Sequence, residues 1–249
     1  MRIGLDSKWL LMLVFAVLPV RAEEVVVSAA ASLTNAFKEV GTAFEKTQAE
    51  AKVTFNFAAS GPLLQQIENG APVDVFVSAD QETMNAAEKK QLTIPATRRN
   101  FVSNQLVLVQ PKAGSPLKGI GDLANDTVRR IAIGNPASVP VGRYTREVLQ
   151  AERLWDSVQP RVINADSVRQ VLDYVARGEV DAGFVYATDA AIATEKVTVV
   201  GTISTPRPVV YPIAVVSTSR RTKLAESFIA FVLAPEAQSI LRKYGFAKP

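Results

Sequence analysis

Strand-like and helix-like segments alternate along nearly the whole chain, and this alternation restricts the fold more than any other feature of the sequence. Runs rich in Val, Ile and Phe predict strands at 25–29, 53–58, 73–79, 104–111, 130–136, 161–165, 181–186 and 209–216. Most of these runs are followed by apolar residues that recur every three or four positions, as a helix requires. The alternation predicts an α/β fold with mostly parallel sheets.

The helical segments have recognisable beginnings and ends. Helices are expected at about 33–44, 60–70, 80–90, 141–155, 166–178, 219–232 and 235–243. Asp80 and Asp166 are the predicted N-caps of two of them, because a carboxylate at that position accepts unpaired backbone N–H groups. Pro212 lies inside a predicted strand, which favours an edge strand or a segment that crosses between two parts of the fold.

The first 22 residues have the pattern of a signal peptide. Arg2 and Lys8 are basic, residues 9–20 are almost entirely apolar, and a small-x-small pattern ends at Ala22. The apolar stretch is short for a transmembrane helix. We therefore expect a signal peptide over 1–22, a mature chain that begins at Glu23, and export to the periplasm.

The chain has no histidine and no cysteine. This excludes Ser-His-Asp and Cys-His catalysis, and it excludes every metal site built on those two residue types. The formal net charge is +4, and the basic residue pairs are scattered along the sequence. We therefore expect no catalytic residue, no metal bound directly as a cation, no cofactor and no nucleic-acid partner.

Four predicted helix starts carry small, hydroxylated or apolar residues directly after a strand or loop. They lie at Ser32, Ser60, Val141 and Val168. The first turn of a helix has unpaired N–H groups and a partial positive charge, which together favour an anion. Any one of these starts, taken alone, is more typical of an ordinary helix than of a ligand site. The position of Tyr186, at the end of a predicted strand, is by itself more typical of a half-buried core tyrosine than of a ligand contact.

Several of these segments together resemble one family. "AASLTNAF", "FAASGPLLQQIENGAPVDVFVSADQETM", "GNPASVPVGRY" and "GFVYATDA" are similar to segments of the periplasmic molybdate-binding proteins of ABC transporters, in the same order and over essentially the whole mature chain. The resemblance implies a two-lobed periplasmic binding protein fold of type II-like topology, with the ligand in the interlobe cleft. It implies one lobe from 23–103 plus 209–249 and a second lobe from 104–208.

The resemblance also implies the site. It assigns hydroxyl and backbone contacts to Ser32 and Ser60, backbone N–H contacts to Val141 and Val168, and a hydroxyl contact to Tyr186. Position 141 is commonly Ala in the family, and a backbone contact tolerates Val there. A pocket of donors suits molybdate, a tetrahedral dianion without a proton, and disfavours monohydrogen phosphate, which must donate a hydrogen bond.

The function implied is capture of molybdate, and of tungstate, by a monomer that delivers the ion to a transmembrane ABC permease. Sulfate or another tetrahedral oxyanion is an alternative ligand, because the sequence does not give the pocket size. A secreted hydrolase that uses Ser32 or Ser60 is disfavoured, since the chain offers neither serine a histidine as base. A transcriptional effector domain of this fold would need a DNA-binding segment, and the predicted leader occupies that end.

Overall fold

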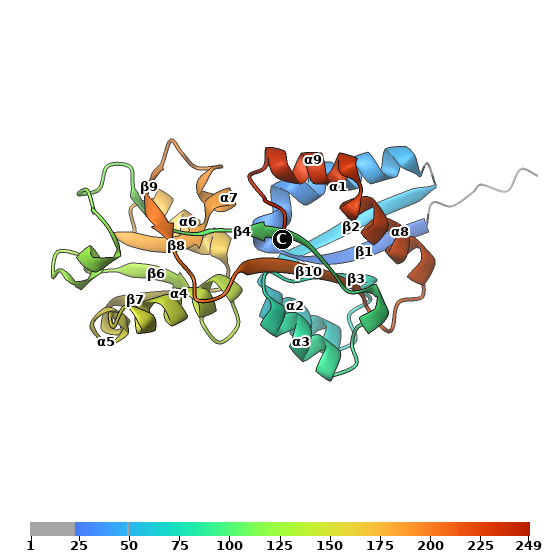
Figure 1. Cartoon of the computed structure of the whole chain (residues 1–249), viewed down its shortest axis with the longest axis horizontal. Helices are drawn as coiled ribbons and strands as arrows, with labels where there is room; N and C mark the ends of the chain where they lie inside the picture. The colour runs from blue at the N-terminus through green and yellow to red at the C-terminus, as the bar shows by residue number, and fades with distance from the viewer. Residues whose placement is uncertain (1–22, 49) are drawn as a thin grey trace, which may run out of the picture.

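The computed structural model describes residues 23–48 and 50–249, which form two five-stranded mixed sheets lying side by side along the long axis of the molecule (Figure 1). The predicted signal peptide and its cleavage after Ala22 lie outside the described residues. Helices pack against both sheets, so the α/β class and the two-lobed arrangement are confirmed. Within the described part, no single helix is long and apolar enough to cross a membrane, although the bent pair formed by the last two helices meets the criterion jointly by length and composition.

The first sheet has the strand order β2-β1-β3-β10-β4. Its strands are β1 (Glu23–Ala30), β2 (Ala51–Ala58), β3 (Val75–Val77), β4 (Arg99–Asn104) and β10 (Val209–Val215). The helices and 3-10 turns of this lobe are η1 (Ala31–Leu33), α1 (Thr34–Thr47), α2 (Ser60–Glu68), α3 (Gln81–Lys89), η2 (Pro95–Thr97), α8 (Thr222–Leu233) and α9 (Pro235–Lys243).

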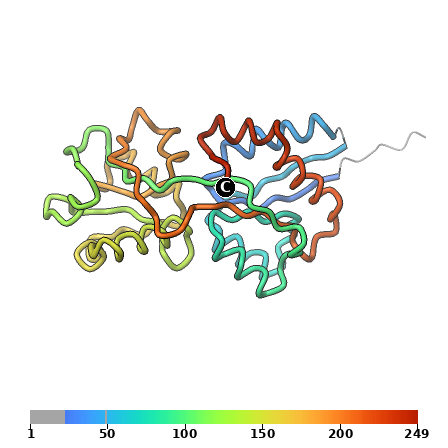
Figure 2. The backbone as a smooth tube through the Cα atoms, in the orientation of Figure 1, coloured from blue at the N-terminus to red at the C-terminus, as the bar shows by residue number. Residues whose placement is uncertain are grey.

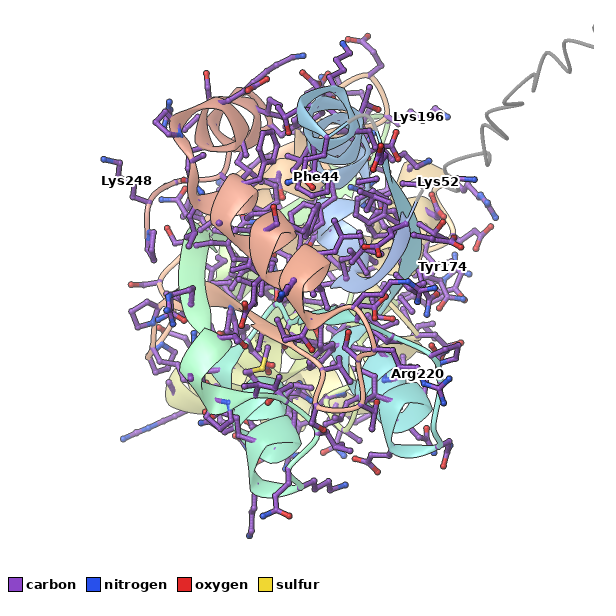
Figure 3. All side chains as sticks on the ribbon, turned by 90° about the vertical axis from the view of Figure 1, so that its right-hand side faces the viewer. Phe44, Lys52, Tyr174, Lys196, Arg220 and Lys248 are labelled. Carbon is purple, nitrogen blue, oxygen red and sulfur yellow. The ribbon has the colours of Figure 1, made fainter. Side chains whose placement is uncertain are left out.

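Aromatic side chains fill the core between this sheet and its helices. The rings of Phe44 and Phe228 meet edge to face at 5.3 Å, and Phe37 packs against Phe228 at 6.2 Å. In the view of Figure 3, Phe44 lies in the interior between the helices, whereas Lys52 and Arg220 extend from the surface. The apolar helix stripe seen in the sequence is therefore the stripe that covers the sheet.

The second sheet has the order β7-β6-β8-β5-β9. Its strands are β5 (Leu106–Pro111), β6 (Ile131–Gly134), β7 (Val162–Ala165), β8 (Ala182–Tyr186) and β9 (Val197–Ile203). The helices and 3-10 turns of this lobe are η3 (Ile120–Ala124), α4 (Pro140–Ala151), α5 (Trp155–Val158), η4 (Gln159–Arg161), α6 (Val168–Ala176) and α7 (Ala187–Ala190).

The chain passes between the lobes twice, from β4 to β5 and from β9 to β10, and the two crossings are visible in the backbone trace (Figure 2). The sheets are mixed: most strands of each sheet run in one direction, as expected, and one strand in each runs opposite to the rest. β10 runs antiparallel to both of its neighbours, and β5 does the same in the second sheet. Both strands follow a crossing from the other lobe, so they enter their sheet without the helical crossover that parallel pairing needs. The lobe boundaries given above stay a prediction.

The strand that contains Pro212 does not lie at an edge. β10 lies between β3 and β4, and the ladder with β4 shifts register between Tyr211 and Pro212. A bulge is one of the few places where a strand tolerates the missing N–H of proline. The edge-strand alternative is therefore wrong, while the strand does lie next to the crossing between the lobes.

Candidate functional site

A small cavity lies where the ends of strands from the first sheet face helix starts from the second lobe. All of the predicted site residues line it: Ser32, Ser60, Val141, Val168 and Tyr186. Alanines, Val139 and Pro140 complete its wall. The space in which the centre of a water-sized sphere fits is about 10 Å³, roughly the space that one water molecule needs. The structure therefore brings the predicted residues together around a space suited to a small solute.

The cavity wall contains the starts of several helices. Ser60 is the first residue of α2, Val168 is the first residue of α6, and Val141 is the second residue of α4. Backbone N–H groups at these positions have no acceptor within their own helix. Ser32 lies in η1, which leads directly into α1. The N-terminal ends of these helices supply donors and partial positive charge to one volume, as an anion requires.

The two serine hydroxyls are buried and each has a protein partner. Ser60 Oγ accepts a hydrogen bond from the Ala79 N–H at 3.0 Å, which leaves the Ser60 proton available as a donor. Ser32 Oγ lies 2.9 Å from Tyr211 Oη. Ala79 and Tyr211 were not predicted from the sequence as partners of the site. No local pattern marks them, because Tyr211 is 179 positions from Ser32 along the chain.

Tyr186 brings a hydroxyl that has no hydrogen-bond partner within the part of the chain that the structure describes. The side chain is 1% exposed, so water does not satisfy this hydroxyl at the surface. An unpaired buried polar group costs about 1–3 kcal/mol, and such a group at a cavity wall is suited to a ligand. Burial raises the pKa of Tyr186 well above its ordinary value, so the hydroxyl keeps its proton and can donate it.

Charged side chains lie behind the cavity wall, and none of the described residues that line the cavity is charged. Arg143 of α4 pairs with Asp80, the residue before α3, at 2.7 Å. Arg169 of α6 pairs with Asp189 of α7 at 2.6 Å, and its guanidinium also donates to Asn35 Oδ1 at 2.9 Å. Arg143 and Arg169 therefore bridge the second lobe to the first on two sides of the cavity.

Asp189 is buried, and its carboxyl has an unusual pKa. Burial raises the pKa from 3.8 to about 6, and the adjacent Arg169 guanidinium acts in the opposite direction. The described residues contain no group of three or more acidic, His or Cys side chains that could hold a metal ion. The site therefore has the chemistry of neutral donors, with its charges compensated in pairs outside the wall.

The two lobes also meet through their backbones. The Gly61 N–H donates to the Ser138 carbonyl oxygen at 3.0 Å, and a Cβ atom at Gly61 would lie 2.4 Å from that oxygen. Only glycine allows this approach in the conformation described. In the sequence, the only sign of this contact is the glycine that directly follows Ser60, and a glycine at that place is equally compatible with an ordinary helix start.

One predicted helix cap is wrong and another is confirmed. Asp80 caps α3 by accepting the Thr83 N–H at 3.1 Å. At α6 the N-cap is Ser167, whose hydroxyl accepts the Gln170 N–H at 3.2 Å, and not Asp166. Asp166 is one position too early for its side chain to reach those amides. It is exposed to solvent, and its carboxylate is not among the groups that line the cavity.

The two-lobed fold and the donor-lined cavity between the lobes define a class of protein, one that encloses a small solute without transforming it. The chain belongs to the bacterial extracellular solute-binding protein family, which matches residues 25–247. This is a family of transport proteins rather than enzymes, so the expected absence of an enzymatic activity is confirmed by family membership, as is the resemblance that the sequence showed.

Individual relatives agree with this assignment. The chain is 38% identical to the Molybdate-binding protein ModA of Escherichia coli, over 90% of this chain and 88% of the relative. The solved periplasmic molybdate-binding protein of Azotobacter vinelandii is 28% identical and superimposes with a TM-score of 0.77, over 90% of this chain and 99% of that one. The sulfate-binding protein SubI of Mycobacterium tuberculosis superimposes with a TM-score of 0.79, over 90% of this chain and 86% of that one. At 17% identity that match shows a shared fold alone.

Proposed function

We propose that this protein captures molybdate in the cavity between its lobes and delivers it to the transmembrane permease of an ABC transporter. The observation that carries the proposal is the convergence of Ser32, Ser60, Val141, Val168 and Tyr186 on one small cavity without a charged lining. Relatives named as molybdate-binding proteins, at 35–38% identity over most of the chain, support this ligand over other small solutes.

The chemistry of the wall supports a fully deprotonated tetrahedral oxyanion. Each oxygen of such an ion accepts hydrogen bonds and offers no proton, and the wall presents N–H and O–H donors. Charge-assisted hydrogen bonds of this kind contribute about 1.5–3 kcal/mol each. Monohydrogen phosphate would bring a proton for which the wall has no carboxylate acceptor, so its binding is disfavoured.

Several finer features belong to the same proposal. Tungstate has the same charge and shape as molybdate, so we expect it to bind as well. Sulfate is smaller and is the alternative ligand. The distance between the donors across the cavity determines whether the site fits sulfate or molybdate better. The protein acts in the periplasm as a monomer, without a cofactor and without nucleic acid, and its lobes, 23–103 plus 209–249 and 104–208, close on the ion by a hinge motion.

Calorimetric titration of the mature protein with molybdate, tungstate, sulfate, phosphate and citrate tests this function. We expect strong binding of molybdate and tungstate, weak binding of sulfate, and no binding of phosphate or citrate. A parallel melting experiment should show about 2.7 kcal/mol of added stability when molybdate is present at a hundred times its dissociation constant. Sulfate binding more tightly than molybdate would establish the alternative ligand, and citrate binding would refute the oxyanion site.

A further inference from the structure

A row of hydrogen bonds extends from Ser32 at the cavity to the crossing strands behind it. Ser32 Oγ lies 2.9 Å from Tyr211 Oη, and Asn104 Nδ2 lies 3.3 Å from the same Tyr211 oxygen. Tyr211 belongs to β10, and Asn104 is the last residue of β4. The two strands are neighbours in the first sheet (Figure 1). Neither residue lines the cavity.

The contact between Gln105 and Asn104 determines which atom donates in each hydrogen bond of this row. The Gln105 backbone N–H, which can only donate, points at Asn104 Oδ1 at 2.9 Å. That contact identifies the oxygen of the Asn104 amide, so the other amide atom is the nitrogen. The Asn104 nitrogen then donates to Thr188 Oγ1 at 2.9 Å and to Tyr211 Oη.

The hydrogen bond from Asn104 determines that Tyr211 donates to Ser32. Its hydroxyl oxygen accepts from Asn104, so its proton needs a different acceptor, and among the described residues the other hydrogen-bond partner is Ser32 Oγ. The Tyr211 side chain is fully buried, and burial raises its pKa well above the ordinary value, so the proton stays in place. The ring is held edge to face against Phe101 and Phe246, which fixes where the hydroxyl lies.

We infer that Tyr211 and Asn104 are positioning residues that hold the Ser32 hydroxyl as a donor toward the cavity. Because Ser32 Oγ accepts from Tyr211, one of its two lone pairs is occupied, and its own proton is not used within the row and can be donated to the ligand. The row therefore favours an oxyanion that carries no proton over one that does. This inference rests on the proposed function and adds two residues that determine its specificity.

Tyr211→Phe breaks the row while leaving the ring in its packing. Ser32 can then turn, so that its oxygen accepts a proton from a ligand as readily as its proton is donated. We expect molybdate affinity to fall about three- to tenfold, the loss of one neutral hydrogen bond. We also expect phosphate to displace bound molybdate more effectively from the variant than from the native protein. Tyr144→Phe is the matched control, because Tyr144 is equally buried and its hydroxyl contacts the Pro208 carbonyl outside the row.

A double-mutant cycle with Ser32→Ala decides whether Tyr211 acts through Ser32. Calorimetry on the four proteins should show that Tyr211→Phe has no further effect once Ser32 is alanine. Equal losses in both backgrounds, or no improvement in competition by phosphate, would overturn the inference. If Ser32→Ala leaves molybdate affinity unchanged, the proposed site itself is wrong, so the two failures are distinguishable.

Asn104→Asp provides a second variant, in case Tyr211→Phe does not fold. The aspartate keeps an oxygen for the Gln105 N–H, but its second oxygen accepts where the amide donated. The Tyr211 proton is then drawn away from Ser32, and molybdate affinity falls. The added negative charge repels molybdate whether or not Ser32 is present. The row is therefore supported only if Asn104→Asp lowers molybdate affinity more in the protein with native Ser32 than in the Ser32→Ala variant. An equal effect in both backgrounds contradicts it.

Discussion

At the scale of single residues, the hydroxyl groups of the cavity wall have protons that are available to a ligand. The Ala79 N–H occupies an acceptor site on Ser60 Oγ, and Tyr186 Oη has no other described partner. These two hydroxyls come from different lobes, since Ser60 begins α2 and Tyr186 ends β8. A ligand that accepts hydrogen bonds on all sides therefore satisfies both lobes at once.

We predict that Ser60→Ala and Tyr186→Phe each weaken molybdate binding by about ten- to a hundredfold, because each removes a hydrogen bond to a charged oxygen worth roughly 1.5–3 kcal/mol. Calorimetry measures the affinity, and circular dichroism checks the fold. Tyr186→Phe should not lower the stability of the unliganded protein, because the hydroxyl has no partner in the described structure. Unchanged affinity in both variants would refute the assignment of these hydroxyls.

Val141 tests the backbone part of the site. Val141→Pro deletes the N–H that we propose as a ligand contact, at a first-turn position that tolerates proline. Val141→Ala keeps the N–H and serves as the comparison. We expect the proline variant to bind molybdate about one to two orders of magnitude more weakly than the alanine variant. Equal affinity in two folded variants would show that this amide is not a ligand.

Asp189 predicts a pH dependence of stability. Its pKa rises from 3.8 to about 6 on folding, so between these values the folded state holds a proton that the unfolded state has released. The contribution of Asp189 to stability is therefore full below pH 3.8, falls as the pH rises to about 6, and is constant above. Urea unfolding of the native protein and of Asp189→Asn should show a free-energy difference that follows this course. A difference that rises with pH would contradict it.

At the scale of helices and strands, most elements could be predicted from apolar periodicity, and the two strands that were not predicted share a cause. β4 and β9 are the outermost strands of their sheets, and within the described residues neither is flanked by a second strand, although Ser103 of β4 forms one bridge with Ala247. β9 alternates buried, half-buried and exposed positions, and β4 has only two buried residues, Phe101 and Val102. Without a continuous apolar run, such strands form because they pair with a neighbouring strand, and the sequence does not show which strand that is.

The residues of the site also fall into two groups, those that local sequence patterns predict and those that only the fold brings together. Helix starts and family motifs identify Ser32, Ser60 and Tyr186, because each of these signals is local. The partners Tyr211 and Asn104 are brought to Ser32 by the crossing strands from far along the chain. No pattern within a window of sequence could pair them, so only the folded structure shows which way a hydroxyl faces.

The corrected cap of α6 gives a prediction at this scale. Ser167→Ala removes the hydroxyl that accepts the Gln170 N–H and should lower the free energy of unfolding by about 1 kcal/mol. Asp166→Ala is the control, because the exposed Asp166 side chain makes no cap, and it should change stability much less. Urea denaturation of both variants measures the difference. A larger loss from Asp166→Ala would restore Asp166 as the cap.

At the scale of the whole molecule, the two lobes are in direct contact around the cavity. Arg143 reaches Asp80, Arg169 reaches Asn35, and the Gly61 N–H reaches the Ser138 carbonyl. These contacts surround the cavity, so each can form fully only when the lobes approach. We therefore expect closure and ligand binding to be linked, so that a change which hinders the approach of the lobes weakens binding without touching the ligand.

Gly61→Ala tests this linkage. The new Cβ would lie 2.4 Å from the Ser138 oxygen, so the closed form loses its backbone hydrogen bond, at a cost of about 1–3 kcal/mol. Molybdate affinity should fall about five- to a hundredfold. The unliganded melting temperature should not fall, because alanine favours helix over glycine. Gly121→Ala, with no atom near its added Cβ, is the control. Native-like affinity in Gly61→Ala would show that the Gly61–Ser138 contact is dispensable for binding.

The position of β10 between β3 and β4 also orders events during synthesis. Every strand of the second sheet lies between Leu106 and Ile203, so that sheet is complete in the nascent chain before residue 209 is made. The first sheet, although it begins near the N-terminus, has a gap beside β3 until β10, at residues 209–215, has been synthesised. The lobe that is translated first is thus the lobe whose sheet is completed last.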